Sequence, residues 1–103
     1  MTDPIKVLIK EPGKEPVLAV IPNDLKSLQK AVGGYIEVVQ LHDDLAMVVN
    51  EEGKIIGLDE NFRLKWDTIV GPAVFLGIDG EDFDDFPSHK YKTFKEVIDY
   101  DRA

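Results

Sequence analysis

The chain has 103 residues and no cysteine, so one domain (1–103) is expected, and disulfides, thiolate metal ligands and thiol catalysis are excluded. Twenty acidic side chains against twelve basic ones give a net charge of −8, which disfavours direct binding to nucleic acid or to an anionic membrane. The N-terminus lacks the basic and apolar stretches of a signal peptide, and no apolar run approaches the roughly 20 residues of a membrane span, so we expect a cytoplasmic protein.

The first two elements are predicted to be strands joined by a turn. In residues 5–10, Ile5, Val7 and Ile9 alternate with their neighbours at a period of two, which is typical of a strand with one face in solvent. The segment "EPGKEP" supplies two prolines and a glycine for a turn. Residues 17–21 are then expected to run back antiparallel as the second strand.

A short amphipathic helix is predicted after the second strand. Pro22 ends that strand, and Asn23 or Asp24 offers a side-chain oxygen to the free amides of a first helical turn. The apolar residues recur at helical spacing, at Leu25, Leu28 and Val32.

Gly33 and Gly34 form the one doubled glycine in the chain, within "LQKAVGGYIEVV". A phosphate-binding glycine loop follows a strand and opens a helix, so that amide groups face the anion. Here the order is reversed, because the glycines close a helix. We therefore interpret them as a joint, in which one glycine is left-handed at the helix end and the other lets the chain turn into a strand.

The middle of the chain is predicted to be a meander of three strands, at residues 35–41, 45–50 and 54–58. The alternation in "NFRLKW" adds a short strand candidate, and residues 69–78 are expected to form the last strand. Pro72 cannot donate to a sheet ladder, which indicates an edge, a bulge or a late start for that strand.

The character of the sequence changes after Ile78. Residues 79–88, "DGEDFDDFPS", are predicted to be a solvated acidic loop, and Ser88 is expected to cap a C-terminal helix over residues 88–101. Its apolar stripe consists of Tyr91, Phe94, Val97 and Ile98.

Together the elements predict an α+β fold, with a mostly antiparallel sheet, one helix after the first hairpin and a C-terminal helix. The opening order also resembles the β-grasp arrangement.

The acidic segment is the main candidate for a protein-contact surface. Aromatic residues mixed with charge are frequent in interfaces. The candidate contact residues are Asp79, Glu81, Asp82, Phe83, Asp84, Asp85 and Phe86. A calcium loop of the EF-hand type fails in both registers, because Phe83 or Pro87 stands where a ligand or a glycine is required, and we expect no metal site.

The sequence offers little for catalysis. His42 and His89 lie 47 residues apart, without the spacing of a zinc site, and both are expected on the surface. Ser27 and Ser88 lie within or at the start of predicted helices, and neither has the setting of a nucleophile. We expect no catalytic residue, no cofactor and no enzymatic activity.

Two further residues are candidate ligand contacts. Glu37 is an acid inside the apolar run "YIEVV", so it either faces outward from an edge strand or is buried beside a partner. Trp66 lies close to acidic residues, although core packing is the more ordinary use of a tryptophan.

The segments "LQKAVGGYIEVV", "VVNEEGKIIGL" and "IVGPAVFLGIDGEDF" resemble a family of small bacterial and phage proteins known only as a domain of unknown function. The resemblance spans residues 5–86. Family members look like products of phages, plasmids and conjugative elements, whose neighbours often include antirestriction and other counter-defence proteins. The resemblance implies a context and supplies no catalytic residues.

These observations favour a non-enzymatic acidic protein that binds a host or element-encoded protein. Its sharpest version is counter-defence, with the acidic surface acting as a decoy of DNA for a DNA-binding partner. The alternative is a protein that binds or sequesters a small ligand such as a nucleotide signal. That alternative requires local positive charge, for which the candidates are Lys26, Lys30, Arg63 and Lys65.

Overall fold

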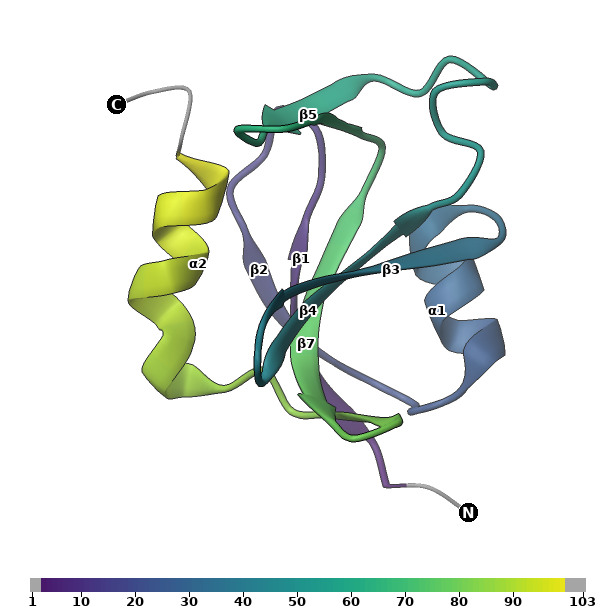
Figure 1. Ribbon diagram of the computed structural model, residues 1–103. Helices are drawn as coiled ribbons and strands as arrows, with labels where there is room; N and C mark the ends of the chain where they lie inside the picture. The colour runs from purple at the N-terminus through teal and green to yellow at the C-terminus, as the bar shows by residue number, and fades with distance from the viewer. Residues whose placement is uncertain (1–2, 100–103) are drawn as a thin grey trace.

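The computed structural model describes residues 3–99, which form a sheet with a helix on each face (Figure 1). The elements in chain order are β1 (Ile5–Lys10), β2 (Val17–Ile21), α1 (Leu25–Val32), β3 (Ile36–His42), β4 (Leu45–Asn50), β5 (Glu60–Arg63), β6 (Thr68–Val70), β7 (Ala73–Asp79), β8 (Asp82–Asp84), the 3-10 turn η1 (Ser88–Lys90) and α2 (Tyr91–Ile98). The predicted α+β class is confirmed.

The main sheet has the order β2-β1-β7-β4-β3, with β8 paired to the end of β7, and β5 and β6 form a separate two-stranded ribbon. Every strand pair in the described part of the chain is antiparallel. The mixed sheet of a β-grasp arrangement therefore does not occur over residues 3–99, although the opening order of elements is similar.

Strands β4 and β7 lie at the centre of the sheet and are covered on both faces. Their sequences, "LAMVVN" and "AVFLGID", are continuous apolar runs rather than alternating ones, as such strands require. The core beneath α1 consists of Ile5, Val7, Leu28, Val32, Ala46, Val48, Val74 and Leu76. The core beneath α2 and the β5–β6 ribbon consists of Leu8, Met47, Val49, Phe62, Leu64, Ile69, Ala73, Phe75, Phe94 and Ile98.

The expectation that one face of β1 lies in solvent is wrong for most of that strand. Lys6 is exposed, but Leu8 joins the core beneath α2, and Lys10 is only 4% exposed. The Lys10 amine donates to Asn61 Oδ1 at 2.9 Å, and the Asn61 amide donates to Lys10 O at 2.6 Å. These bonds hold the buried charge where β1 meets the β5–β6 ribbon.

Helix α1 forms where the capping residues and the apolar spacing predict it. Asp24 is the N-cap, and its Oδ1 accepts from Ser27 N at 2.8 Å. This amide, together with the Ser27 hydroxyl, holds the pKa of Asp24 below its ordinary value. Leu28 and Val32 are buried against the sheet, whereas Leu25 is exposed.

The predicted meander is wrong at its third strand. Residues 51–57 form consecutive turns, and Ile55 is 83% exposed. β4 pairs with β7 on the side where a strand over residues 54–58 was expected.

The strand predicted over residues 69–78 is divided into β6 and β7 by Gly71, which has φ 73°, and Pro72. The late start that the proline indicated is therefore correct for β7.

The C-terminal segment differs from the prediction in two respects. β8 lies inside the expected acidic loop and forms a hairpin with β7. The helix expected over residues 88–101 begins with η1, in which the Ser88 side chain makes no capping hydrogen bond, and α2 covers residues 91–98. Residues 100 and 101 lie outside the described part of the chain. Within the expected stripe Phe94 and Ile98 are buried, but Tyr91 is exposed.

Candidate functional site

The acidic segment forms a hairpin at one end of the sheet (Figure 1). The pairing of β7 with β8 extends to Asp79 and Asp82, which leaves Gly80 and Glu81 as a two-residue turn. Gly80 has φ 64°, a conformation that favours glycine at the first central position of such a turn. The acidic side chains of the hairpin and its continuation are all exposed: Asp79, Glu81, Asp82, Asp84 and Asp85.

Hydrogen bonds from two other segments fix this hairpin. Asn23 Nδ2 donates to Phe83 O at 3.1 Å, which ties the start of α1 to β8. Lys6 N donates to Asp85 Oδ1 at 2.8 Å, and Phe86 N donates to Lys6 O at 2.7 Å. The segment after β8 therefore runs alongside β1, and the carboxylates stand on an anchored scaffold.

The two aromatic residues of the acidic segment turn inward. Phe83 packs against the core beneath α1. Phe86 packs against the core beneath α2, with its ring centroid 5.6 Å from that of Phe94. Both rings lie under the acidic surface and anchor it, so the outward-facing groups of the hairpin are the carboxylates.

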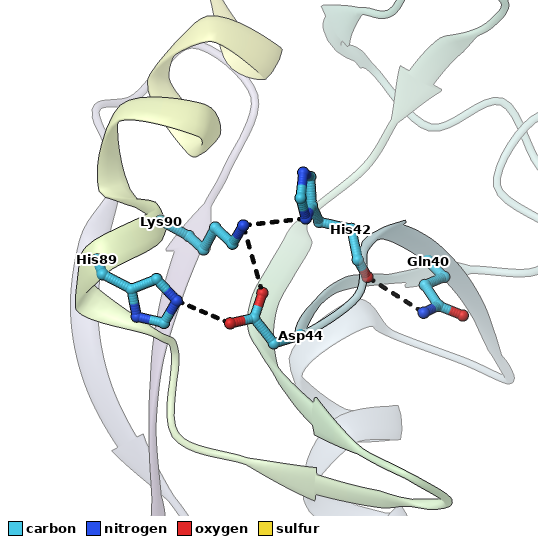
Figure 2. Close-up of polar contacts among 5 residues, drawn as sticks. All are labelled: Gln40, His42, Asp44, His89 and Lys90. Carbon is cyan, nitrogen blue, oxygen red and sulfur yellow. Dashed lines mark hydrogen bonds and ion pairs between the residues drawn. The ribbon is translucent and has the colours of Figure 1, made fainter.

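The two histidines meet in one polar cluster beside the hairpin (Figure 2). His89 Nε2 donates to Asp44 Oδ2 at 2.8 Å, and Lys90 Nζ lies 3.8 Å from Asp44 Oδ1. Lys90 Nζ also donates to His42 Nδ1 at 3.0 Å, which requires a lone pair on that nitrogen because an ammonium group only donates. Gln40 Nε2 donates to His42 O at 3.1 Å. The cluster ties η1, which precedes α2, to the end of β3 and the turn that follows it, and both histidines are exposed as predicted.

A cleft of about 620 Å³ adjoins this cluster and the hairpin. Its acidic lining residues are Asp44, Asp79, Asp84 and Asp85. The basic groups in its lining are Lys6 and His89, so the excess charge favours a cationic group over a nucleotide phosphate. Four basic residues were candidates for local positive charge: Lys26, Lys30, Arg63 and Lys65. They line neither this cleft nor the three smaller cavities described below.

The Gly33–Gly34 pair is the joint that the sequence predicts. Gly33 has φ 80°, and the N–H groups of both glycines donate to Gln29 O, at 2.8 and 3.0 Å. The buried Asn50 side chain completes the helix end, because its Nδ2 donates to Val32 O at 3.1 Å. A Cβ on Gly34 would lie 2.8 Å from that Nδ2, so the close approach requires glycine.

The two candidate ligand contacts, Glu37 and Trp66, are both exposed. Glu37 lies on β3 at an edge of the sheet, the simpler of its two predicted positions, and lines a cavity of about 260 Å³. The Lys54–Asp67 ion pair lines the same cavity, and the Lys54 amine holds the pKa of Asp67 below its ordinary value. Trp66 is 67% exposed between β5 and β6, so the expectation of core packing is wrong.

The sequence interpretation missed three features of these surfaces. The contact between Asp44 and His89 joins residues 45 positions apart, and no local pattern marks it. The role of Asn50 also depends on a distant helix end. The hairpin, by contrast, has a sequence signal, because a Gly-X pair between two strand-like runs is typical of a tight turn.

The described part of the chain has neither a cluster of metal ligands nor a membrane-spanning helix. Within residues 3–99, no group of three or more His, Asp or Glu side chains is arranged to hold a metal ion. In the same range, neither helix has the length and apolar character needed to cross a membrane.

Comparison with known proteins adds a family. The family described as "Domain of unknown function (DUF3846)" matches residues 5–99, which extends the resemblance seen over residues 5–86 through α2. No curated protein and no solved structure matches the chain. Because the family match covers nearly all of the sequence, the protein belongs to the DUF3846 family, a domain of unknown function.

Proposed function

We propose that the protein is a non-enzymatic binding module of a phage or another mobile element, and that its acidic end occupies a basic surface of a host or element-encoded protein. The observation that carries this proposal is the set of exposed carboxylates on the anchored β7–β8 hairpin and along the adjoining cleft. The mobile-element origin rests on the sequence resemblance to phage and plasmid products.

Neighbouring bases do not balance the charge at this end. Within residues 3–99, Asp79, Glu81, Asp82 and Asp84 form no ion pair. The nearby Lys90 is already engaged by the polar cluster around Asp44. A fixed array of uncompensated carboxylates accelerates association with a basic surface, and salt screens the effect.

DNA-binding faces are basic surfaces that already accept closely spaced negative charges. The DNA-binding face of a host nuclease or helicase is therefore the partner that the acidic end fits best. Occupation of that face would keep DNA away from the enzyme, which agrees with a counter-defence role in a mobile element.

Two triple variants with the same loss of charge test the proposal. The hairpin variant carries Asp79→Asn, Glu81→Gln and Asp82→Asn, whose side chains are exposed and form no ion pair within residues 3–99. The control variant carries Glu15→Gln, Asp59→Asn and Glu96→Gln, which are exposed elsewhere on the chain. Wild type and both variants are tagged and used to capture proteins from nuclease-treated host lysate at low and raised salt, with mass spectrometry as the readout.

The proposal predicts a DNA-binding protein that wild type and the control variant retain at low salt. The hairpin variant should lose this protein, and raised salt should release it from wild type. Equal retention by all three proteins, or a partner whose retention does not depend on salt, would contradict the role of the acidic end.

A further inference from the structure

A second surface lies at the end of α1 that is remote from the acidic hairpin. α1 begins beside the hairpin, where Leu25 and Phe83 line one small cavity, and eight residues later it ends at the glycine joint (Figure 1). There a cavity of about 270 Å³, here called the joint groove, is lined by Gln29, Gly33, Gly34, Tyr35, Asn50, Glu52 and Ile56. A helix of that length separates the two surfaces by about 12 Å.

The lining of the joint groove is mainly apolar, and its apolar side chains are exposed. Tyr35 is 66% exposed and Ile56 is 57% exposed, although both are large hydrophobic residues. Ile55, the most exposed large hydrophobic residue in the described part of the chain, lines the neighbouring 260 Å³ cavity. Asn50 belongs to both cavities, so the two form one continuous surface. Exposed hydrophobic groups that line a cavity are typical of a binding surface.

The floor of the joint groove is fixed before any partner arrives. Asn50 is buried, and its side chain is held at both ends, since Nδ2 donates to Val32 O and Oδ1 accepts from Glu52 N at 2.8 Å. Gly34 packs directly on that amide. The floor cannot collapse without breaking these hydrogen bonds. Binding therefore loses little conformational entropy in this part of the protein.

The charges around the groove are negative and unbalanced. Glu52 lines the joint groove, and Glu37 and Glu51 line the neighbouring cavity. Within residues 3–99 none of these three carboxylates forms an ion pair. The basic residue in the lining, Lys54, is already paired with Asp67.

We propose that the joint groove binds a peptide segment of a partner protein in which an apolar side chain is flanked by lysine or arginine. The apolar side chain enters the cavity of about 270 Å³ between Tyr35 and Ile56. The flanking basic groups then meet Glu52, Glu51 and Glu37, and this charge complementarity selects the partner.

A second copy of the chain is not the occupant that the charges favour. A twofold dimer through this surface would set the same carboxylates against each other, and each copy carries a net charge of −8. The proposal is independent of the function proposed for the acidic end, because the two surfaces share no lining residue.

Selection of displayed peptides tests the proposal without a known partner. A random library of 12-residue peptides is selected against the full-length protein, with the Tyr35→Ser/Ile56→Ser double variant used for counter-selection. Both side chains are exposed, so the double variant should fold, and its amide spectrum checks this. Enriched peptides are expected to share one large apolar residue and at least two lysines or arginines.

An enriched peptide is then titrated into the 15N-labelled protein. The amide signals of residues 33–35 and 50–56 should shift until the protein is saturated. Ile56→Ser should raise the dissociation constant about tenfold. Glu51→Gln/Glu52→Gln should raise the dissociation constant about two- to tenfold, and this effect should be smaller at raised salt. The control variant Glu15→Gln/Asp59→Asn/Glu96→Gln should leave the dissociation constant unchanged.

Four results of the peptide experiments would overturn the proposal. These are the absence of enrichment, enriched peptides without basic residues, equal binding by the double variant, and shifts confined to the acidic hairpin. Concentration-dependent shifts of the groove signals without peptide would also overturn it, since they would make a second copy the occupant. The role proposed for the acidic end is tested separately by the hairpin variant, and its failure would leave the joint-groove proposal standing.

Discussion

Replacement of Gly34 by alanine probes the joint that sets both the end of α1 and the floor of the joint groove. The new Cβ would lie 2.8 Å from Asn50 Nδ2, closer than such atoms approach in folded proteins. The Asn50 side chain cannot move freely, because it is only 6% exposed and its two ends bond Val32 O and Glu52 N. The substitution therefore has to break or distort at least one buried hydrogen bond.

The size of the effect follows from those two hydrogen bonds. A buried polar group that loses its partner costs about 1–3 kcal/mol. We expect Gly34→Ala to lower the free energy of unfolding by about 1–3 kcal/mol, and each kcal/mol lowers the melting temperature by about 4–8 °C in a domain of this size. Asn50→Ala should cost a similar amount, because it leaves Val32 O and Glu52 N without their partner.

A double-variant cycle, measured by urea unfolding and circular dichroism, isolates the cause. In Gly34→Ala/Asn50→Ala the clash is absent. The double variant should therefore lose clearly less free energy of unfolding than the sum of the losses in the two single variants. Gly33→Ala is the matched control, because its Cβ meets open space and its cost of about 1–2 kcal/mol comes from φ 80° alone. That cost should be the same with and without Asn50. Additive costs for Gly34→Ala and Asn50→Ala, or a stable Gly34→Ala protein, would refute the reasoning.

Three further perturbations test the acidic end, the core and the first helix. Gly77→Ala should loosen the hairpin, because its Cβ would collide with the Asp85 carbonyl oxygen; hydrogen exchange of the Phe86 amide should accelerate, and unchanged exchange would contradict this. Phe94→Ala should lower the free energy of unfolding by about 3–5 kcal/mol in urea titrations, because the ring is fully buried with three ring centroids 4.7–5.7 Å away; a cost below about 1 kcal/mol would contradict the packing. The lowered pKa of Asp24 means that its ionised cap stabilises the fold fully above the ordinary Asp pKa of about 3.9, and that this contribution is lost as the pH falls through the folded-state pKa. The stability of wild type relative to the non-titrating Asp24→Asn should therefore fall over that acid range, and a difference independent of pH would rule out the charged cap.

Much of the fold was predictable because its signals are local. The cap at Asp24, the spacing of Leu28 and Val32, and the left-handed glycine after the helix all act within a few residues of one another. The first hairpin is marked in the same way by its turn residues, and β1 and β2 have the predicted bounds. Local chemistry therefore fixes where these elements begin and end.

The errors arise where distant segments decide the structure. Residues 54–58 have the composition of a strand, but β7 returns from further along the chain to pair with β4, and Ile55 and Ile56 remain in solvent. Contacts with distant elements also bury Leu8 against the prediction, beneath α2 and the β5–β6 ribbon, and bury Lys10 beside Asn61 of that ribbon. No periodicity in one segment contains that information.

The candidate sites follow the same division. The acidity of the hairpin was visible in the sequence, and the structure adds the scaffold that fixes it. The pairing of Asp44 with His89 and the pinning of the glycine joint by Asn50 bring together residues from separate elements. The joint groove is likewise a product of the fold, since its lining comes from α1, the residues between α1 and β3, the end of β4 and the segment after β4.

Displacement of a captured partner by DNA tests the central claim most directly. The partner retained by immobilised wild-type protein is titrated with a short duplex DNA, and the released fraction is measured against DNA concentration. If the acidic end occupies a DNA-binding face, the duplex should release the partner completely, and any residual complex with the hairpin variant Asp79→Asn/Glu81→Gln/Asp82→Asn should dissociate at lower DNA concentration. A partner that binds saturating duplex while it stays on the protein would contradict the claim, because the two ligands would then occupy different surfaces.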